Sequence, residues 1–197
     1  MIEVSNIYIS NVANAMRGMR NPLNSWEKGD TRESKWAVEI GQNDLQLAQK
    51  LVKAGTDHSK FMRMIMVSMD ITAPLYWFKE FDTYKVGTVA NSCSTMHTIH
   101  TKPFTLFDFS YDSLTIKSVD CLQHTINLLE TYRGYYNKTK DKKWWYQIIQ
   151  LLPSSYNQKR TVLLNYQVLR NMYFARRNHK LDEWVNFCKE IEKLEKF

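Results

Sequence analysis

The chain has 197 residues, of which 44% are hydrophobic, and it carries a formal net charge of +7. This length and apolar content suffice for one buried core, and no linker rich in Pro, Gly or Ser divides the chain, so we expect residues 1–197 to form a single domain. The first residues lack the charged and apolar regions of a signal peptide, and no run of about 18 apolar residues is present that would span a membrane. We therefore expect a cytoplasmic protein without a membrane partner.

Three cysteines, Cys93, Cys121 and Cys188, lie far apart and form no CxxC pair. This spacing argues against a disulfide framework and against a structural zinc site, so we expect no metal and a reducing compartment.

Basic residues concentrate between 133 and 180, where eleven Lys and Arg accompany one acid, Asp141, a local balance of +10. Such a field favours polyanions, including phosphorylated metabolites, dinucleotides and nucleic acid. A solvated basic face would give the same charge pattern, and both interpretations stay open.

A helix, a strand and a second helix are predicted in the first half of the chain. Asn43 is a good N-cap for a helix over 43–53. Apolar residues alternate over 64–71, which indicates a strand with one buried face. Thr72 is then expected to cap a helix with Pro74 in its first turn, where a missing N–H does no harm.

The second half of the chain reads mainly as helices. Residues 91–94 are expected in a loop, and the aromatic segment 102–111 in a loop with a short helix. Periodic apolar residues predict helices over 119–136, 142–151, 166–175 and 181–194, and a strand over 160–164. The expected class is α+β: helix-rich, with a small mixed or antiparallel sheet.

Cys93 lies close in sequence to His97 and His100, which suggests a thiol nucleophile with a histidine base. The two histidines, three residues apart, would also make half of a metal site. Sequence neighbours seldom converge as a catalytic pair, and no third metal ligand is evident. A polar loop is the favoured interpretation.

The segment around Asn165, Gln167 and Asn171 is rich in amides, and Arg176 follows it. On a helix, positions i and i+4 share a face, so Gln167 and Asn171 should lie together, with Asn165 at the helix entrance. An amide supplies both a donor and an acceptor for the edge of a planar heterocycle, and an arginine fork binds a carbonyl or a phosphate. Helix capping and solvent exposure explain the same residues equally well.

Taken together, these segments resemble the flavin-dependent thymidylate synthases, from about Asn43 to the C-terminal helix. A strand leads through Ala73-Pro74 into a helix, and Asn91 and Ser94 match the N-x-x-S core of a family loop. The remaining matches are His58-Ser59, Leu152-Pro153, Asn165, Leu169, Asn171 and Arg176.

The resemblance implies the family's fold and a site for two ligands. FAD would be bound by His58, Ser59, Lys85, Asn91, Asn165 and Asn171. A pyrimidine nucleotide resembling dUMP would be held by Arg176, with Ser94 beside the uracil, and these two residues would serve catalysis. The family methylates dUMP to dTMP with NADPH and methylenetetrahydrofolate, and assembles as a homotetramer whose active sites are shared between subunits.

The chain departs from the family at several positions, some of them cationic. An Arg-His-Arg motif is replaced by Tyr84-Lys85-Val86, or by Thr83-Tyr84-Lys85 in the adjacent register. Ser92, Met96 and His97 replace a Glu, an Arg and a Tyr. Two alternatives follow: a relative that binds a nucleotide without catalysis, and a nucleic-acid-binding protein that uses the basic segment 133–180.

Overall fold

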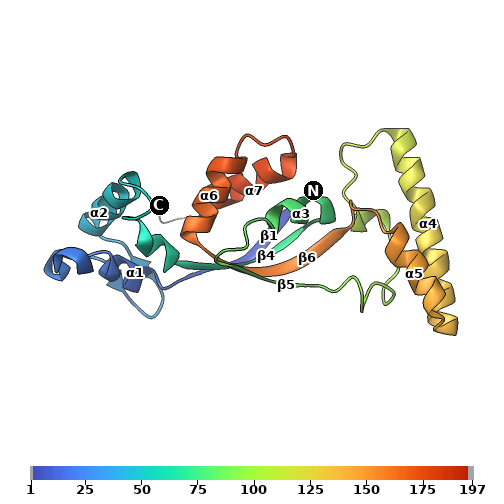
Figure 1. Ribbon diagram of the computed structural model, residues 1–197, viewed down its shortest axis with the longest axis horizontal. Helices are drawn as coiled ribbons and strands as arrows, with labels where there is room; N and C mark the ends of the chain where they lie inside the picture. The colour runs from blue at the N-terminus through green and yellow to red at the C-terminus, as the bar shows by residue number, and fades with distance from the viewer. Residues whose placement is uncertain (1, 195–197) are drawn as a thin grey trace. The chain divides into compact units, whose positions relative to one another are not determined.

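The computed structural model describes residues 2–194 and has an α+β fold (Figure 1). The α-helices are α1 (Val12–Gly18), α2 (Gln42–Lys53), α3 (Leu75–Phe81), α4 (Ile116–Thr139), α5 (Lys142–Leu151), α6 (Tyr166–Arg176) and α7 (Asp182–Glu192). The strands are β1 (Glu3–Ser10), β2 (Arg32–Glu33), β3 (Val38–Glu39), β4 (Met66–Pro74), β5 (Thr88–Ser92) and β6 (Asn157–Asn165). Short 3-10 helices are η1 (Asn21–Leu23), η2 (Trp26–Lys28), η3 (Lys60–Arg63) and η4 (Leu106–Asp108). The predicted class, helix-rich α+β with a small sheet, is confirmed.

Four strands form one sheet in the order β1-β4-β6-β5, while β2 and β3 make a separate antiparallel pair. Along β4, the side chains from Met66 to Ala73 alternate between half-buried and buried, as expected for a strand with one face in the core. The alternation in the sequence therefore predicted this strand correctly, although the strand continues to Pro74.

The chain forms two compact units. The first, here the hairpin unit, contains Ile71–Thr83 and Asn91–Thr161 with the start of the chain. The second, here the α6 unit, contains Val4–Asp70, Tyr84–Ala90 and residues 162–194. Strands β4 and β6 contribute residues to both units, and a single domain over 1–197 stays a prediction.

Most of the predicted elements are present. The helices predicted over 43–53, 119–136, 142–151, 166–175 and 181–194 correspond to α2, α4, α5, α6 and α7, and the short helix predicted in 102–111 is η4. Elements before residue 42 were not predicted. Along β1, exposed and half-buried side chains do not alternate from one residue to the next. No apolar face therefore marks this strand in the sequence.

The helix caps predicted at Asn43 and Thr72 are wrong, because more distant groups satisfy these two helix starts. The N-cap position of α2 is Gly41, and the backbone N–H groups of Asn43 and Asp44 donate to the Asp30 carboxylate over 2.8 and 3.0 Å. Thr72 lies within β4 rather than at a helix start. Local sequence signals could not show the Asp30 contact, since that carboxylate comes from outside the helix.

Helix α3 begins directly after Pro74, which occupies the N-cap position with extended backbone angles. The first backbone N–H groups of the helix, at Leu75 and Tyr76, donate to the carbonyl oxygens of Tyr156 and Ser154, each over 3.0 Å. These contacts replace the hydroxyl cap that was expected from Thr72.

The core of the hairpin unit forms where α4 and α5 lie side by side (Figure 1). Leu122, Ile126 and Leu129 recur every three or four residues, so they share one face of α4, and all three are buried. They belong to one cluster with Ile148 of α5 and Phe104 of the preceding loop.

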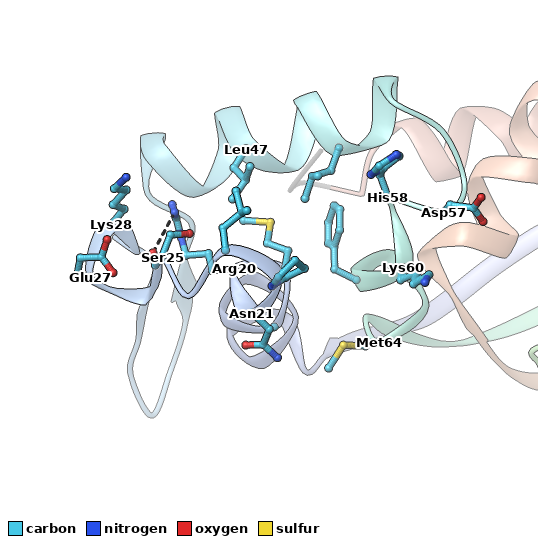
Figure 2. Close-up of a pocket in the computed structure, with 16 residues that line it drawn as sticks. Arg20, Asn21, Ser25, Glu27, Lys28, Leu47, Asp57, His58, Lys60 and Met64 are labelled. Atoms are coloured by element: carbon cyan, nitrogen blue, oxygen red, sulfur yellow. Dashed lines mark hydrogen bonds between the residues drawn. The ribbon is translucent and has the colours of Figure 1, made fainter.

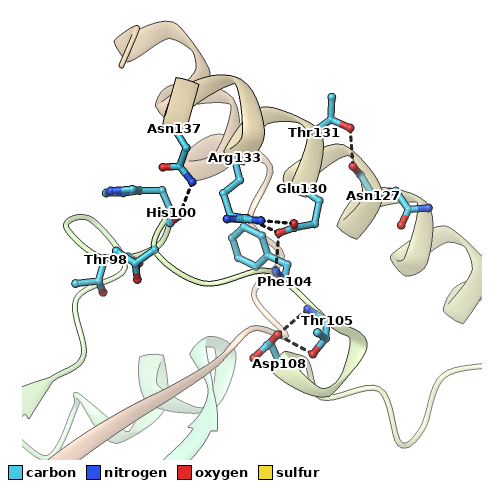
Figure 3. Close-up of polar contacts among 11 residues, drawn as sticks. Thr98, His100, Phe104, Thr105, Asp108, Asn127, Glu130, Thr131, Arg133 and Asn137 are labelled. Atoms are coloured by element: carbon cyan, nitrogen blue, oxygen red, sulfur yellow. Dashed lines mark hydrogen bonds and ion pairs between the residues drawn. The ribbon is translucent and has the colours of Figure 1, made fainter. Parts of the chain in front are cut away.

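Polar contacts attach the loop that contains Phe104 to α4 (Figure 3). Glu130 accepts hydrogen bonds from the backbone N–H of Phe104 over 2.6 Å and from Arg133 over 2.7 and 2.8 Å. Burial alone would raise the pKa of Glu130, but these hydrogen bonds outweigh it and lower the pKa. Further along, Asn137 donates to the His100 carbonyl oxygen over 3.0 Å.

Candidate functional site

A chain of hydrogen-bonded side chains runs along one face of α6. The Ser59 hydroxyl donates to Gln167 Oε1 over 3.2 Å, and Gln167 Nε2 donates to Asn171 Oδ1 over 3.0 Å. Ser59 is buried, Gln167 is half-buried and Asn171 is exposed. The predicted pairing of Gln167 with Asn171 is confirmed. Because each acceptor in this chain is already engaged, the exposed end at Asn171 presents an amide N–H₂ donor.

Asn165 starts α6 as its N-cap, with its side-chain Oδ1 accepting from the backbone N–H of Val168 over 3.1 Å. Only 8% of Asn165 is exposed. A methyl group added at Gly87, where φ is +77°, would lie 2.7 Å from the Asn165 Nδ2 atom, so glycine allows this close approach. Burial also raises the pKa of the neighbouring Tyr166 to about 12, which keeps its hydroxyl neutral.

Arg176 ends α6 within a group of aromatic and imidazole side chains. Its Nε donates to the Tyr84 hydroxyl over 3.0 Å, and its Nη1 lies 3.0 Å from His179 Nε2. The guanidinium carbon is 4.9 Å from the ring centroid of Trp184, a cation–π distance. The ring of His179 is held in turn by the backbone N–H of Leu181, which donates to Nδ1 over 3.2 Å. The fork of Arg176 is therefore fixed from several sides.

The two groups lie on different faces of α6. Gln167 and Arg176 are nine positions apart, which at roughly 100° per residue turns them about 180° around the helix axis. Asn171 and Arg176 are five positions apart, or about 140°. The amide chain and the arginine group are therefore separate candidate subsites.

Asn91 and Ser94 belong to the hairpin unit, whereas the other predicted site residues belong to the α6 unit. The loop expected over 91–94 is partly wrong, because Asn91 lies within β5 and only the chain after Ser92 leaves the strand. The Ser94 Oγ accepts from the backbone N–H groups of Met96 and His97 over 3.2 and 3.0 Å. This turn occupies the oxygen as an acceptor and leaves the hydroxyl proton to be donated.

A cavity of about 710 Å³ lies in the α6 unit, lined by residues of α2, of η3 and of the chain that follows α1 (Figure 2). Its lining includes His58, Lys60 and Lys28 together with the apolar side chains of Leu47 and Phe61. The volume is within the roughly 300–1,000 Å³ that is typical of small-molecule sites. His58 thus lies at a cavity lined by both basic groups and acids, the latter being Glu27 and Asp57. Lys85 is exposed at the surface of the same unit.

The alternative pairing of Cys93 with nearby histidines gains no support from the contacts. The backbone N–H of Cys93 donates to Lys159 over 2.9 Å, which attaches it to β6. His100 packs edge-on against Tyr136 of α4 at 4.9 Å. These attachments fit the polar-loop interpretation. Within residues 2–194, no group of three or more His, Cys, Asp or Glu is arranged to hold a metal ion, and no helix is long and apolar enough to cross a membrane.

The partners of Arg176 were not identified from the sequence. His179 follows Arg176 by three positions, a spacing at which side chains near a helix end can meet. Tyr84 and Trp184 come from a separate segment and a separate helix, and periodicity carries no signal for such contacts. Tyr84 occupies one of the positions where the chain departs from the Arg-His-Arg motif.

The sequence matches no protein-family model and no curated protein sequence. Solved structures do match. A crystal structure of flavin-dependent thymidylate synthase ThyX from Helicobacter pylori, complexed with FAD and dUMP, is similar with a TM-score of 0.68 and 16% sequence identity, over 96% of this chain and 91% of that chain. Another structure of ThyX from Helicobacter pylori with FAD and dUMP gives a TM-score of 0.68 and 15% identity, over 97% of this chain and 91% of that one. The chain therefore has the fold of flavin-dependent thymidylate synthase, as the resemblance in its sequence implied.

Proposed function

We propose that this protein binds a flavin and a pyrimidine nucleotide and modifies the nucleotide, by the reductive methylation of dUMP to dTMP. The observation that carries the proposal is the fixed guanidinium of Arg176, held by Tyr84 and His179 and stacked on Trp184. A preorganised arginine fork loses little freedom when it binds a carbonyl or phosphate oxygen. In this proposal it binds the nucleotide.

The donor set along α6 fits a flavin ring. Its pyrimidine-like edge presents carbonyl oxygens, and the hydrogen-bond directions from Ser59 through Gln167 leave the Asn171 amide as a donor at the exposed end. Asn165 and the side chains of His58, Lys85 and Asn91 would hold other parts of FAD. A bound flavin would supply the redox chemistry, with NADPH and methylenetetrahydrofolate as cosubstrates.

Ser94 acts in this proposal as a hydrogen-bond donor to the uracil. Its oxygen already accepts two backbone N–H groups, so its proton is the part available to a ligand. Its function is then to orient the base. A nucleophilic role would instead require a general base beside the hydroxyl.

We propose further that the protein is a homotetramer with sites shared between subunits. The amide chain and Arg176 lie on opposite sides of α6, so we expect a stacked flavin and nucleotide to contact only one of these two groups on any one helix. A second copy would bring the complementary group to each ligand. The C-terminal helix α7, which lies beside α6, would take part in that assembly.

Binding measurements with matched variants test the proposal. The purified protein should retain FAD after excess is removed, seen as visible absorption, and should bind dUMP by calorimetry. Arg176→Ala should weaken dUMP binding by about tenfold or more, because a hydrogen bond to a charged group contributes about 1.5–3 kcal/mol. Arg177→Ala, on the exposed neighbouring position, should leave it unchanged.

The flavin assignment has its own pair of variants. Asn171→Ala should release FAD, whereas Asn178→Ala, in the exposed turn after α6, should not. Binding of both ligands without formation of dTMP would identify a non-catalytic nucleotide-binding relative. The proposal would be overturned if the protein binds neither FAD nor dUMP.

A further inference from the structure

The turn that joins α4 to α5 carries a dense positive charge. Within residues 138–143 there are four lysines and one acid, Asp141, a net charge of +3. Asp141 pairs with Lys143, whose Nζ lies 3.1 Å from its carboxylate. Lys138, Lys140 and Lys142 are exposed. The turn therefore presents a cluster of solvated cations that one acid only partly offsets.

Aromatic rings surround the same turn. Trp144 packs against Tyr132 and Tyr135, with ring centroids 5.8 and 4.8 Å apart. The exposed fractions of Tyr135 and Tyr146 are 45% and 44%. Side chains from the ends of both helices thus give the turn a partly exposed aromatic surface.

Lysines lie over these rings in three separate pairs. Lys140 Nζ lies 5.5 Å from the ring centroid of Tyr136. Lys142 Nζ lies 5.3 Å from the ring centroid of Tyr146, and Lys143 Nζ lies 4.9 Å from that of Trp144. Each pair places a cation next to an aromatic face.

We propose that this surface, here the basic aromatic turn (Tyr132–Tyr146), binds single-stranded nucleic acid. Lysines contact the phosphates, and unpaired bases stack on the exposed tyrosines. A repeated combination of a cation and a ring matches the alternation of phosphate and base along a strand. Double-stranded nucleic acid fits less well, because its bases are already stacked on one another. The inference does not rest on the proposed flavin chemistry, whose assigned residues lie outside this segment.

The composition of the turn favours nucleic acid over an anionic membrane. A helix that binds a membrane surface inserts aliphatic side chains or Trp below the headgroups. Between 132 and 146, where the structure describes every residue, the large hydrophobic side chains that are exposed are the two tyrosines, Tyr135 and Tyr146. Their hydroxyl-bearing rings suit stacking better than insertion.

The test is fluorescence anisotropy with a labelled oligothymidylate of about twelve nucleotides, a typical length for such a site. Wild-type affinity should fall steeply with salt. Lys138→Gln/Lys142→Gln should weaken binding and reduce the slope of log K against log salt by about 1.4, since two phosphate contacts are lost. Tyr146→Leu should weaken binding about tenfold with an unchanged slope, because it removes stacking alone.

The control is Lys50→Gln/Lys53→Gln on α2, which removes the same charge at exposed positions of the other unit. It should bind as the wild type does, and circular dichroism should show all variants folded. The proposal is overturned if the control weakens binding as much as Lys138→Gln/Lys142→Gln, or if Tyr146→Leu has no effect. Equal competition by inorganic polyphosphate, or preferential binding to vesicles containing phosphatidylglycerol, would also overturn it, as would no binding at all.

Discussion

A single buried ion pair connects three segments of the α6 unit. Arg20 Nε donates to Asp44 over 2.6 Å, and only 5% and 3% of the two side chains are exposed. The second carboxylate oxygen of Asp44 accepts from the backbone N–H groups of Thr31 and Asp30 over 2.9 and 3.2 Å. Removing one member of such a pair leaves the other charge buried, so its cost exceeds the net contribution of the pair.

We therefore expect Asp44→Asn to lower the free energy of unfolding by about 3–5 kcal/mol at neutral pH. Urea denaturation measures this change, and Asp57→Asn, at an exposed position of the same unit, is the control and should change little. A loss of less than about 1 kcal/mol would mean that the pair is solvated rather than buried.

The same carboxylate sets a pH dependence. Burial would raise the pKa of Asp44, but hydrogen bonds from Thr31 and Arg20 outweigh it and lower the pKa. A lowered pKa gives stability that is fully present above the unfolded value of about 3.9 and is lost as pH falls through the folded value. The stability difference between wild type and Asp44→Asn should therefore shrink on acidification below about pH 4, measured by urea denaturation across that range. A difference that stays constant would contradict the assignment.

At the scale of elements, the start of α6 combines a structural and a proposed ligand role in one side chain. Asn165 uses its Oδ1 to cap the helix, while FAD binding would use its Nδ2. Asn165→Asp keeps the capping oxygen and removes the N–H₂ donor, whereas Asn165→Ala removes both.

Asn165→Ala should therefore lower the free energy of unfolding by about 1 kcal/mol, and Asn165→Asp should leave it nearly unchanged. If the amide also binds flavin, Asn165→Asp should lose FAD affinity despite normal stability. Thermal unfolding and FAD titration of both variants separate the two roles. Full FAD affinity in Asn165→Asp would show that Asn165 caps the helix and does not bind FAD.

The elements that the sequence predicted are those whose signal is local. The i to i+4 spacing of Gln167 and Asn171 was sufficient to place them together, and the period-two burial of β4 marked that strand. What failed depends on contacts between distant segments. The cap of α2 comes from Asp30, and the hydroxyl that holds Arg176 comes from Tyr84. Neither contact has a periodic pattern, so a single sequence cannot show it.

At the scale of the whole molecule, the likeness to the solved structures is a likeness of fold. At 16% identity to ThyX, the likeness fixes the path of the chain but not its ligands. Tyr84 stands where the resemblance expects part of a cationic motif, and its neutral hydroxyl accepts a hydrogen bond from Arg176 over 3.0 Å.

Assembly gives the most direct test of how the two faces of α6 work together. Asn171→Ala and Arg176→Ala should each abolish dTMP formation, because each removes one subsite. If a site takes its amide chain from one subunit and its arginine from another, oligomers with both variants will contain some intact sites. Random mixing places the two intact groups together in about one quarter of the sites of a symmetric oligomer.

Coexpression of the two variants should therefore restore about a quarter of the wild-type rate of dTMP formation, with light scattering reporting a tetramer. The double variant Asn171→Ala/Arg176→Ala, coexpressed with wild type, controls for simple dilution of active subunits. If both groups act within one subunit, the mixed oligomers will stay inactive, since every subunit lacks one of them. A monomer in solution would exclude the shared site. A flavin at Asn171 and a nucleotide at Arg176 would then lie on opposed faces of one α6, which would contradict the proposed reaction between them.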